Sequence, residues 1–384
     1  MISSAESQPS FLRLSLVGII ACVLLTACQT TNYHVDESDQ RHFRYKRHEL
    51  TDPAITYFGR HEWQGKTPVQ TWPGSGLRFR TNATEILLEL DDKKGLNFYN
   101  IFIDQNYSKP QIVDLEEGLQ VIKIDLPAKT EDDNESVLVE LFRRTEGQEG
   151  ETLIKALLTN RSAQLYKAPP LPERRIEIYG DSITTGLGNA APPNDPDDQK
   201  KDVNNFMAYG SIAARALDAQ IMNTSQSGIG IMTSWFDYTM PDIYDQSNAD
   251  YNNDSTWDFS QYPADLVVIN LLQNDSWLIE KNLDPVPDRK DIIDAYADFV
   301  SLLLPNYPGA KFLLILGSMD AVAPGSRWPN ILNDVEDKLT KNHPERIFDT
   351  LIFPYTGYQK HPRIPQHQKN AELFVAKARK MMGW

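Results

Sequence analysis

The fold of this chain is decided by one segment, Ile176-Glu-Ile-Tyr-Gly-Asp-Ser-Ile-Thr-Thr-Gly186. Its first half is a short β-branched and aromatic run, which is typical of a buried strand. The run ends in Gly180-Asp181-Ser182, and the small residues that follow can open a helix. This pattern predicts that Ser182 lies just beyond the carboxyl end of a strand, in the crevice where open α/β sheets bind their ligands.

The region around this segment alternates between apolar runs and helical stretches. Strands are predicted at 176–179, 220–224, 266–272, 311–316 and 347–353, and helices at 207–217, 292–304, 331–339 and 366–382. Continuous apolar strands between helices imply a parallel sheet that helices cover on both faces. Residues 174–384 are therefore predicted to form an α/β domain, which begins after the stiff linker Lys167-Ala-Pro-Pro-Leu-Pro172.

The preceding region, residues 51–166, has a different texture. Short β-rich runs at 77–80, 86–90, 100–104, 119–124 and 137–142 are separated by clusters of turn residues. No helical period interrupts them. The economical interpretation is an antiparallel β-sandwich of the jelly-roll type.

The first 28 residues resemble the leader of a bacterial lipoprotein. An apolar run from Leu14 to Leu25 follows Arg13, and it is too short to span a bilayer comfortably. The run ends in Leu25-Thr26-Ala27-Cys28, which is similar to a lipobox. The resemblance implies cleavage before Cys28, a lipid on that cysteine and a place in the cell envelope. Because Gln29 follows the cysteine, the resemblance favours sorting to the outer membrane. The alternative interpretation of the apolar run is a buried helix or a membrane anchor.

Composition narrows the partners of the chain. Residues 29–50 are polar and mixed in charge, so we predict a solvated tether there. Cys22 and Cys28 both lie in the leader, which excludes a disulfide and a cysteine-rich metal site from the mature chain. The net charge of −15 argues against nucleic acid or an anionic membrane surface as a partner.

Residues that suit nucleophilic catalysis follow successive predicted strands. Ser182 is the candidate nucleophile, Gly228 follows the second strand with an unobstructed N–H, and Asn274 follows the third strand with an amide donor. His361 lies just before the last helix. A histidine can activate a serine hydroxyl, while N–H groups can bind a developing oxyanion.

Elimination also favours His361 as the base. The predicted α/β domain has only three histidines, His343, His361 and His367. His343 precedes a predicted strand and would fall at the opposite edge of a parallel sheet. His367 lies inside a predicted helix, where a core or surface role is expected. His361 lies in the loop after the last strand, at the edge where ligands bind.

Together these blocks resemble the SGNH (GDSL-type) hydrolases, which are named for their Ser, Gly, Asn and His blocks. The resemblance extends to the acetyl esterases of carbohydrate esterase family 2, which pair an N-terminal jelly roll with an SGNH domain. It is carried by Tyr57-Phe-Gly-Arg60, Phe142-Arg-Arg-Thr-Glu-Gly147, Thr239-Met-Pro-Asp-Ile-Tyr244, Trp257-Asp-Phe259, Pro263-Ala-Asp-Leu-Val-Val-Ile-Asn270, and His361-Pro362 followed by His367-Gln368.

The resemblance implies a chemistry for each block. Ser182 would attack an ester carbonyl, and His361 would take its proton and pass it to the departing sugar hydroxyl. The N–H groups of Ser182 and Gly228 and the side chain of Asn274 would hold the oxyanion. The expected substrate is an acetylated polysaccharide or oligosaccharide of the xylan or glucomannan type, and neither a metal nor an organic cofactor is needed.

The chain departs from the SGNH pattern at two places. Leu272 stands where relatives usually have glycine, so its side chain is expected to tilt the Asn274 amide or narrow the pocket. Many relatives also have an aspartate shortly before the histidine, whereas this chain has Tyr358 and Gln359. We therefore predict a Ser-His dyad in which a backbone carbonyl accepts from the imidazole ring.

Two aspartates and three tryptophans complete the candidate residues. Asp181 and Asp275 are each expected to stabilise their own turn or cap the following helix. Aromatic residues are frequent between 235 and 262, which is predicted to be a long loop near the site. Trp235, Trp257 and Trp277 are the candidates for sugar binding, with Trp277 the first choice. The alternative is that these rings pin the loop to the body of the protein.

Two other functions remain open from the sequence. The first is a glycan-binding lipoprotein that keeps the esterase fold without turnover, which Leu272 and the missing aspartate would favour. The second is an esterase for other short acyl esters, such as acyl lipids or the O-acetyl groups of peptidoglycan.

Overall fold

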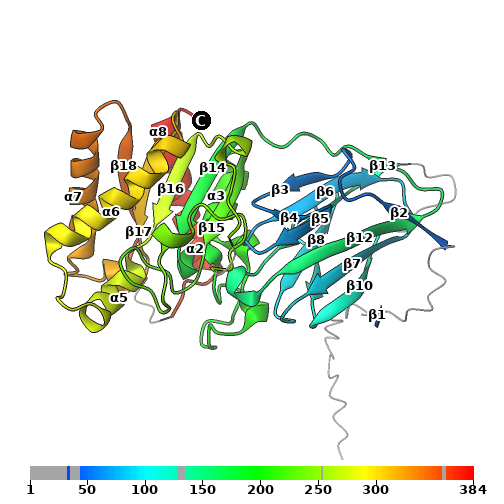
Figure 1. Cartoon of the computed structure of the whole chain (residues 1–384), viewed down its shortest axis with the longest axis horizontal. Helices are drawn as coiled ribbons and strands as arrows, with labels where there is room; N and C mark the ends of the chain where they lie inside the picture. Colours follow the sequence, from blue (N-terminus) through cyan, green and yellow to red (C-terminus); the bar gives the residue numbers. More distant parts are fainter. Residues whose placement is uncertain (1–32, 35–43, 128–134, 252–253, 357–359) are drawn as a thin grey trace, which may run out of the picture.

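A computed structural model describes residues 33–34, 44–127, 135–251, 254–356 and 360–384. Figure 1 shows a sheet-rich N-terminal region beside a C-terminal sheet that carries helices on both faces. The predicted leader with Cys28 lies outside the described residues. Among the helices that the structure describes, none is both long and apolar enough to cross a membrane.

The N-terminal region contains two antiparallel sheets, one 7-stranded and one 6-stranded. The first runs in the order β1 (Tyr33–His34), β10 (Gly118–Ile124), β7 (Ile86–Asp92), β12 (Thr152–Asn160), β5 (Thr67–Gln70) and β4 (Glu62–Gln64), with β2 (Tyr45–His48) also paired to β12. The second runs β13 (Leu165–Tyr166), β6 (Gly76–Thr81), β11 (Val137–Arg143), β8 (Phe98–Ile103) and β9 (Gln111–Asp114), with β3 (Thr56–Phe58) paired to β6.

The two sheets form a sandwich because alternate residues of their strands point into a shared core. Leu88 and Leu90 of β7 belong to the same buried cluster as Phe79 of β6 and Leu141 of β11. The predicted β-rich domain is confirmed, while its jelly-roll type stays a prediction. The sequence did not predict β12, because a bulge between Ile154 and Ala156 interrupts the alternation of that strand.

Part of the predicted tether, residues 29–50, belongs to the sandwich instead. Residues 45–48 form β2, which pairs with β12, and Tyr45 and His48 are only 8% and 7% exposed. The tether prediction is wrong there because the two buried residues flank an exposed Lys46-Arg47 pair. A strand with two basic residues outward has a polar composition and looks like solvated chain.

The C-terminal region is built on a 5-stranded parallel sheet in the order β15-β14-β16-β17-β18. The strands are β14 (Arg174–Gly180), β15 (Ala219–Ser225), β16 (Leu266–Asn270), β17 (Lys311–Leu316) and β18 (Phe348–Ile352). The helices are α2 (Ser182–Thr185), α3 (Tyr209–Ala216), α4 (Met240–Ile243), α5 (Gln273–Asn282), α6 (Arg289–Leu303), α7 (Trp328–Asn342) and α8 (Ile364–Met382). The predicted parallel α/β sheet is confirmed.

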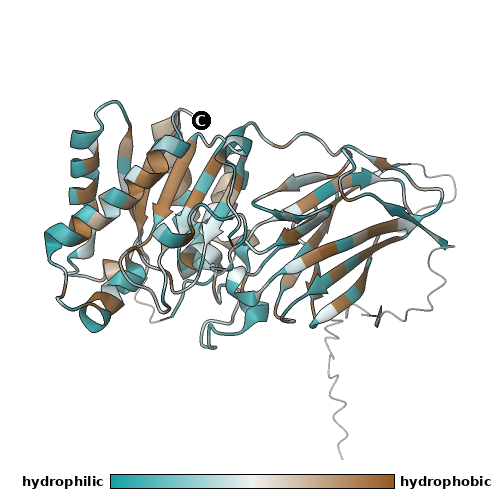
Figure 2. Cartoon of the chain, viewed as in Figure 1, coloured by the Kyte–Doolittle hydropathy of each residue, from teal (hydrophilic) through white to brown (hydrophobic). Residues whose placement is uncertain are grey.

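Each strand of this sheet is buried on both sides. Leu266 and Val268 of β16 pack with α3 and α8, whereas Val267 and Ile269 pack with α6 and α7. Successive side chains of a strand point to opposite faces, so both sets must be apolar when helices cover both faces. Figure 2 shows the result: the central strands are brown and the outer sides of the helices are teal.

The strand order positions the candidate site. Gly180 at the end of β14 is in register with Ser225 of β15 on one side and with Asn270 of β16 on the other. The chain continues from β14 to β15 on one side of the strand and then returns to β16 on its other side. This reversal of the strand order opens a crevice beyond the carboxyl ends of the strands. Ser182, Gly228 and Asn274 follow those three strands, so they meet at this crevice.

The sandwich is joined to the α/β domain by a buried ion pair. The Arg60 guanidinium, which is 0% exposed, donates to Glu177 Oε1 at 3.0 Å and to Tyr179 Oη at 3.1 Å. Breaking a buried pair by removing one partner typically costs about 3–5 kcal/mol, because the other charge is left buried without compensation. We therefore expect the two domains to hold one relative orientation.

Candidate active site

A tight turn presents Ser182 at the carboxyl edge of the sheet. Asp181 is the N-cap of α2, and its Oδ1 accepts from the main-chain N–H of Ile183 at 3.0 Å. The prediction that Asp181 caps the following helix is therefore confirmed. A Cβ at Gly180 would lie 2.1 Å from the Thr184 hydroxyl oxygen, so the turn can close only with glycine there.

The structure brings Ser182, His361 and an unpredicted third residue, Asp197, into one hydrogen-bonded series. His361 Nε2 lies 2.8 Å from Ser182 Oγ, and His361 Nδ1 lies 2.8 Å from Asp197 Oδ2. Because Nδ1 donates to the carboxylate, Nε2 is left as the acceptor for the serine hydroxyl. The predicted dyad with a backbone carbonyl is wrong in this respect, since a carboxylate holds the ring.

Asp197 stays charged in this arrangement. The side-chain hydrogen bond from His361 holds the pKa of Asp197 well below its usual value, although partial burial opposes the shift. The main-chain N–H of His361 donates to the same oxygen at 2.8 Å. A permanent negative charge at Nδ1 stabilises the imidazolium that forms when Nε2 takes a proton.

The loop that carries Asp197 is tied to the histidine loop. Arg363, 4% exposed, donates to Gly188 O and to Asp195 O, both at 2.8 Å. Gly188 has φ +59, and a Cβ there would lie 2.3 Å from the Asp197 Cβ, so only glycine permits the approach. Asp197 was hard to predict, because it stands 164 positions before His361 in a loop rich in proline and aspartate.

Three N–H groups of the predicted site are candidates for binding an oxyanion. Asn274 Nδ2 donates to Ile229 O at 2.8 Å, and a side-chain amide has a second N–H to offer. Gly228 adopts φ +83, a conformation that favours glycine. Among the residues that the structure describes, no recorded hydrogen bond uses the main-chain N–H of Ser182 or Gly228. This set has the composition of an oxyanion hole.

Trp235 holds two members of that set. Its indole Nε1 donates to Asn274 Oδ1 at 3.1 Å, which leaves the amide nitrogen directed to the other side. Its main-chain N–H donates to Gly228 O at 3.0 Å. The indole is nevertheless 62% exposed, so one aromatic side chain both orients the donors and offers a surface to a ligand.

Leu272 does not narrow the site as predicted. Its side chain is 0% exposed and belongs to the core cluster that packs against α6 and α7. Its backbone explains why glycine suits this position: φ is +85, in the left-handed region, which costs about 1 kcal/mol for a residue with a Cβ. Burial of the leucine side chain offsets that cost.

Asp275 reaches beyond its own turn, which was the role predicted for it. Its carboxylate accepts from the main-chain N–H groups of Ile231, Met232 and Thr233, the closest at 2.8 Å. These residues follow Gly228, so Asp275 anchors the loop that carries this candidate oxyanion donor. Burial raises the pKa of Asp275, and the donated hydrogen bonds oppose the shift.

Comparison with known proteins agrees with this geometry. The family model described as carbohydrate esterase 2 N-terminal matches residues 57–169. An acetylxylan esterase / glucomannan deacetylase of Cellvibrio japonicus is 27% identical over 343 residues, which cover 87% of this chain and 90% of that protein. The chain is a relative of the family 2 carbohydrate esterases.

Two further comparisons extend the relationship. The cellulase/esterase CelE of Acetivibrio thermocellus is 29% identical over 348 residues, which cover 87% of this chain and 40% of that longer protein. A solved family two carbohydrate esterase from Clostridium thermocellum, in complex with cellohexaose, superposes with a TM-score of 0.77 at 26% identity. It covers 86% of this chain and 99% of its own. The resemblance inferred from the motifs is thereby confirmed.

The three predicted sugar-binding tryptophans lie in different surroundings. Trp235 is at the site and exposed. Trp277 is half-buried, and its Nε1 donates to Asp320 Oδ2 at 3.1 Å. Trp257 is only 8% exposed, with the Arg60 guanidinium 5.4 Å from its ring centre. The prediction for Trp257 is wrong, because its ring packs in the core and presents no face to a ligand.

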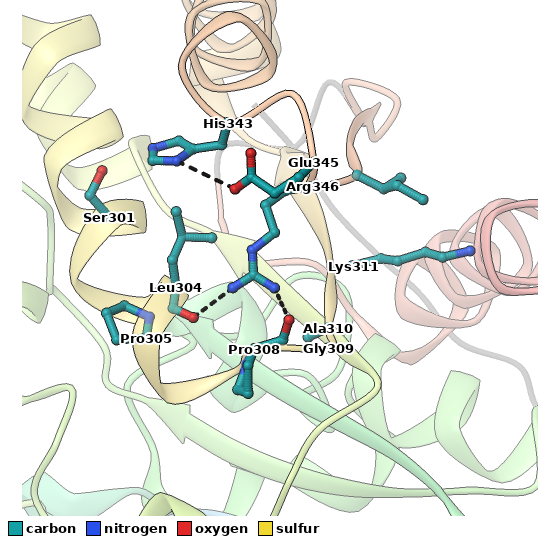
Figure 3. Close-up of a pocket in the computed structure, with 11 residues that line it drawn as sticks. Ser301, Leu304, Pro305, Pro308, Gly309, Ala310, Lys311, His343, Glu345 and Arg346 are labelled. Carbon is teal, nitrogen blue, oxygen red and sulfur yellow. Dashed lines mark hydrogen bonds and ion pairs between the residues drawn. The ribbon is translucent and has the colours of Figure 1, made fainter.

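In the part of the chain that the structure describes, the two other histidines of the α/β domain, His343 and His367, form no recorded hydrogen bond with Ser182. His367 is 0% exposed and accepts from the Tyr209 N–H at 3.1 Å, and burial lowers its pKa to about 3. His343 lines a cavity of about 620 Å³ near the start of β17, at the amino edge of the sheet (Figure 3). Both positions agree with the sequence prediction that neither His343 nor His367 is the catalytic base.

Proposed function

We propose that this chain is a serine esterase that removes O-acetyl groups from polysaccharides of the xylan or glucomannan type. The observation that carries the proposal is the series Ser182–His361–Asp197, with 2.8 Å at each step. It stands beside the Gly228 N–H and the second N–H of the Asn274 amide, whose first N–H donates to Ile229 O. The relatives named as acetylxylan esterase / glucomannan deacetylase support an acetylated polysaccharide as the substrate.

In the first half-reaction, Ser182 Oγ bonds to the acetyl carbon while its proton moves to His361 Nε2. The carbonyl oxygen becomes an oxyanion, which accepts from the N–H groups of Ser182 and Gly228 and from Asn274 Nδ2. The intermediate then collapses, the bond to the sugar oxygen breaks, and His361 returns the proton to that oxygen. Acetylated Ser182 and a free sugar hydroxyl remain.

In the second half-reaction, water takes the place of the sugar hydroxyl. It loses a proton to His361 Nε2 as its oxygen attacks the acetyl carbon, and the same donors bind the second oxyanion. Collapse releases acetate and returns the proton to Ser182. Asp197 keeps its charge throughout and balances the imidazolium in both steps, so the reaction runs as a triad.

The sugar would rest against Trp235. Its exposed indole lies within hydrogen-bond distance of Asn274, so a ring stacked there holds its acetyl group close to Ser182. Trp277 stays a candidate for a more distant contact, since it follows Asn274 by one turn of α5. We further infer the jelly-roll type for the sandwich. The support is that the chain crosses repeatedly between the two sheets, as from β5 to β6, β7 and β8 and from β9 to β10, β11, β12 and β13.

We also propose that the chain is exported and held in the bacterial cell envelope, in the outer membrane, by a lipid on Cys28. The support is the lipobox-like sequence Leu25-Thr26-Ala27-Cys28 after an apolar run. Labelling with an alkyne fatty acid should mark the parent chain and not Cys28→Ala. If both fractionate with the membranes unlabelled, the lipid proposal is wrong.

Acetate release from acetylated xylan and glucomannan by residues 29–384, beside Ser182→Ala, tests the function. Release by the parent that Ser182→Ala abolishes supports a serine deacetylase, and the ratio between the polymers ranks them as substrates. If the folded parent releases no acetate from either polymer but binds both, the protein is a glycan-binding protein. Release only from short acyl lipids would assign the other ester class.

A further inference from the structure

The loop between β11 and β12 of the sandwich reaches into the α/β domain and binds both main-chain groups of Ser227. The Ser227 N–H donates to Glu146 Oε2, and Gln148 Nε2 donates to Ser227 O at 2.9 Å. Ser227 is the residue immediately before Gly228, the candidate oxyanion donor. No other side-chain hydrogen bond to the Ser227 main chain is recorded among the described residues.

The peptide bond converts this contact into control of the oxyanion donor. Ser227 C=O and Gly228 N–H belong to the same planar, trans peptide unit, so they point in opposite directions. A donor that fixes the direction of the Ser227 carbonyl therefore fixes the direction of the Gly228 N–H. Gln148 supplies that donor, and Glu146 holds the preceding peptide unit through the Ser227 N–H.

The loop itself is held firmly enough to act as a support. Arg143, 0% exposed, donates to Glu146 O at 2.9 Å and to Gly150 O at 2.7 Å. A Cβ at Gly147 would lie 2.2 Å from the Ala249 Cβ, so the loop packs against Ala249 with no room for a side chain. The Glu146 carboxylate is buried, with that residue 1% exposed.

From this geometry we propose that Glu146 and Gln148 are positioning residues for the oxyanion hole, so that the sandwich completes the active site of the α/β domain. The proposal rests on the esterase function proposed above. It assigns the N-terminal domain a catalytic contribution that is separate from any binding of glycan. Neither residue touches substrate; both act through the Ser227–Gly228 peptide.

The test is steady-state kinetics on a soluble acetylated xylo-oligosaccharide. Gln148→Met removes the donor at similar volume, at a half-buried position. We expect kcat to fall about 10-fold with KM unchanged, part of the roughly 10²- to 10³-fold that loss of a whole oxyanion donor costs. The kcat of Glu146→Leu should fall at least as far as that of Gln148→Met. Glu146→Gln keeps an acceptor oxygen and should retain most of the parent kcat.

Glu149→Gln is the matched control. Glu149 lies in the same loop, is 2% exposed and pairs with Lys200 at 2.6 Å, without contacting Ser227. Its kcat should stay near that of the parent, and thermal melting checks that every variant is folded. Unchanged kcat in folded Gln148→Met and Glu146→Leu, or a rise in KM alone, would overturn the proposal.

Amide hydrogen exchange makes the result independent of turnover. Exchange in residues 226–230 should be faster in Gln148→Met than in the parent, with the rest of the α/β domain unchanged. If the parent releases no acetate but exchange in residues 226–230 is still faster in Gln148→Met, the esterase function is refuted and the support role of the loop is retained. Equal exchange in the two proteins would refute the support role itself.

Discussion

Opposite edges of the parallel sheet carry the same three kinds of side chain: a serine, a histidine and a carboxylate. At the carboxyl edge, Ser182, His361 and Asp197 lie within hydrogen-bond distance of one another in series. At the amino edge, a cavity of about 620 Å³ is lined by residues that include Ser301, His343 and Glu345 (Figure 3). The kinds of side chain present therefore do not distinguish the set at the carboxyl edge from the set at the amino edge.

Geometry does distinguish them. His343 Nδ1 lies 4.0 Å from Glu345 Oε1, and that carboxylate side chain is 68% exposed. The Ser301 hydroxyl donates to Ala297 O within its own helix at 2.8 Å. At the carboxyl edge the histidine and aspartate side chains are 17% and 24% exposed, so their interaction is less screened. The carboxyl ends of parallel strands bring turns and free N–H groups together. The volume of a cavity therefore does not indicate which edge of the sheet carries the active site.

The largest loss should come from removing the base at the carboxyl edge. Among the residues that the structure describes, His361 is the only recorded hydrogen-bond partner of Ser182 Oγ, so His361→Ala leaves the proposed oxyanion donors without a base. We expect kcat on acetylated xylan to fall by about 10⁴-fold or more, as for triad members elsewhere. Acetate release measures it, and circular dichroism checks the fold. A fall of less than about 10-fold would mean that another group serves as the base.

The next loss should come from Asp197→Asn, which decides between a triad and a dyad. The asparagine keeps the size of the side chain but removes the charge that balances the imidazolium. Its amide group can also hold His361 in the wrong tautomer, so we expect kcat to fall about 10²- to 10⁴-fold. Asp198→Asn, on the exposed part of the same loop, is the matched control. Full activity in both variants would mean that Asp197 is not needed and would support a Ser-His dyad.

The contrast between Asp197 and the other triad members shows how far sequence reasoning reaches. Ser182 was predictable because the nucleophile turn is encoded by neighbouring residues, namely the β-branched run and Gly180-Asp181. His361 was predictable by elimination among few histidines. Asp197 was not, because its position depends on how two loops 164 residues apart pack together. Local pattern carries no signal for such a contact.

The same distinction applies to the fold. The α/β strands were predicted because each is a continuous apolar run, and the observed β17 has the predicted bounds of 311–316. Strand β2 was missed because its basic residues face solvent. Trp257 was misassigned because an aromatic residue in a loop has the same sequence appearance whether it faces a sugar or the buried Arg60. Tertiary contacts decide both cases.

A smaller loss is expected from Trp235→Phe, which separates orientation from stacking. Phenylalanine keeps an aromatic surface for the sugar but removes the N–H that donates to Asn274 Oδ1. One hydrogen bond contributes about 0.5–1.5 kcal/mol, so kcat should fall about 3- to 10-fold while KM changes little. Kinetics on the acetylated xylo-oligosaccharide measure both constants. A rise in KM with unchanged kcat would limit Trp235 to sugar binding.

The smallest effect is expected at the amino edge, where His343→Ala removes the histidine of the second set. His343 makes no contact with Ser182, and its distant carboxylate partner is mostly exposed. Substitutions at such positions change stability by about 0.5 kcal/mol or less, so kcat should stay within about 2-fold of the parent. Acetate release and thermal melting measure the two. A loss comparable to that of His361→Ala would mean that the cavity at the amino edge, and not the crevice at the carboxyl edge, is the site of hydrolysis.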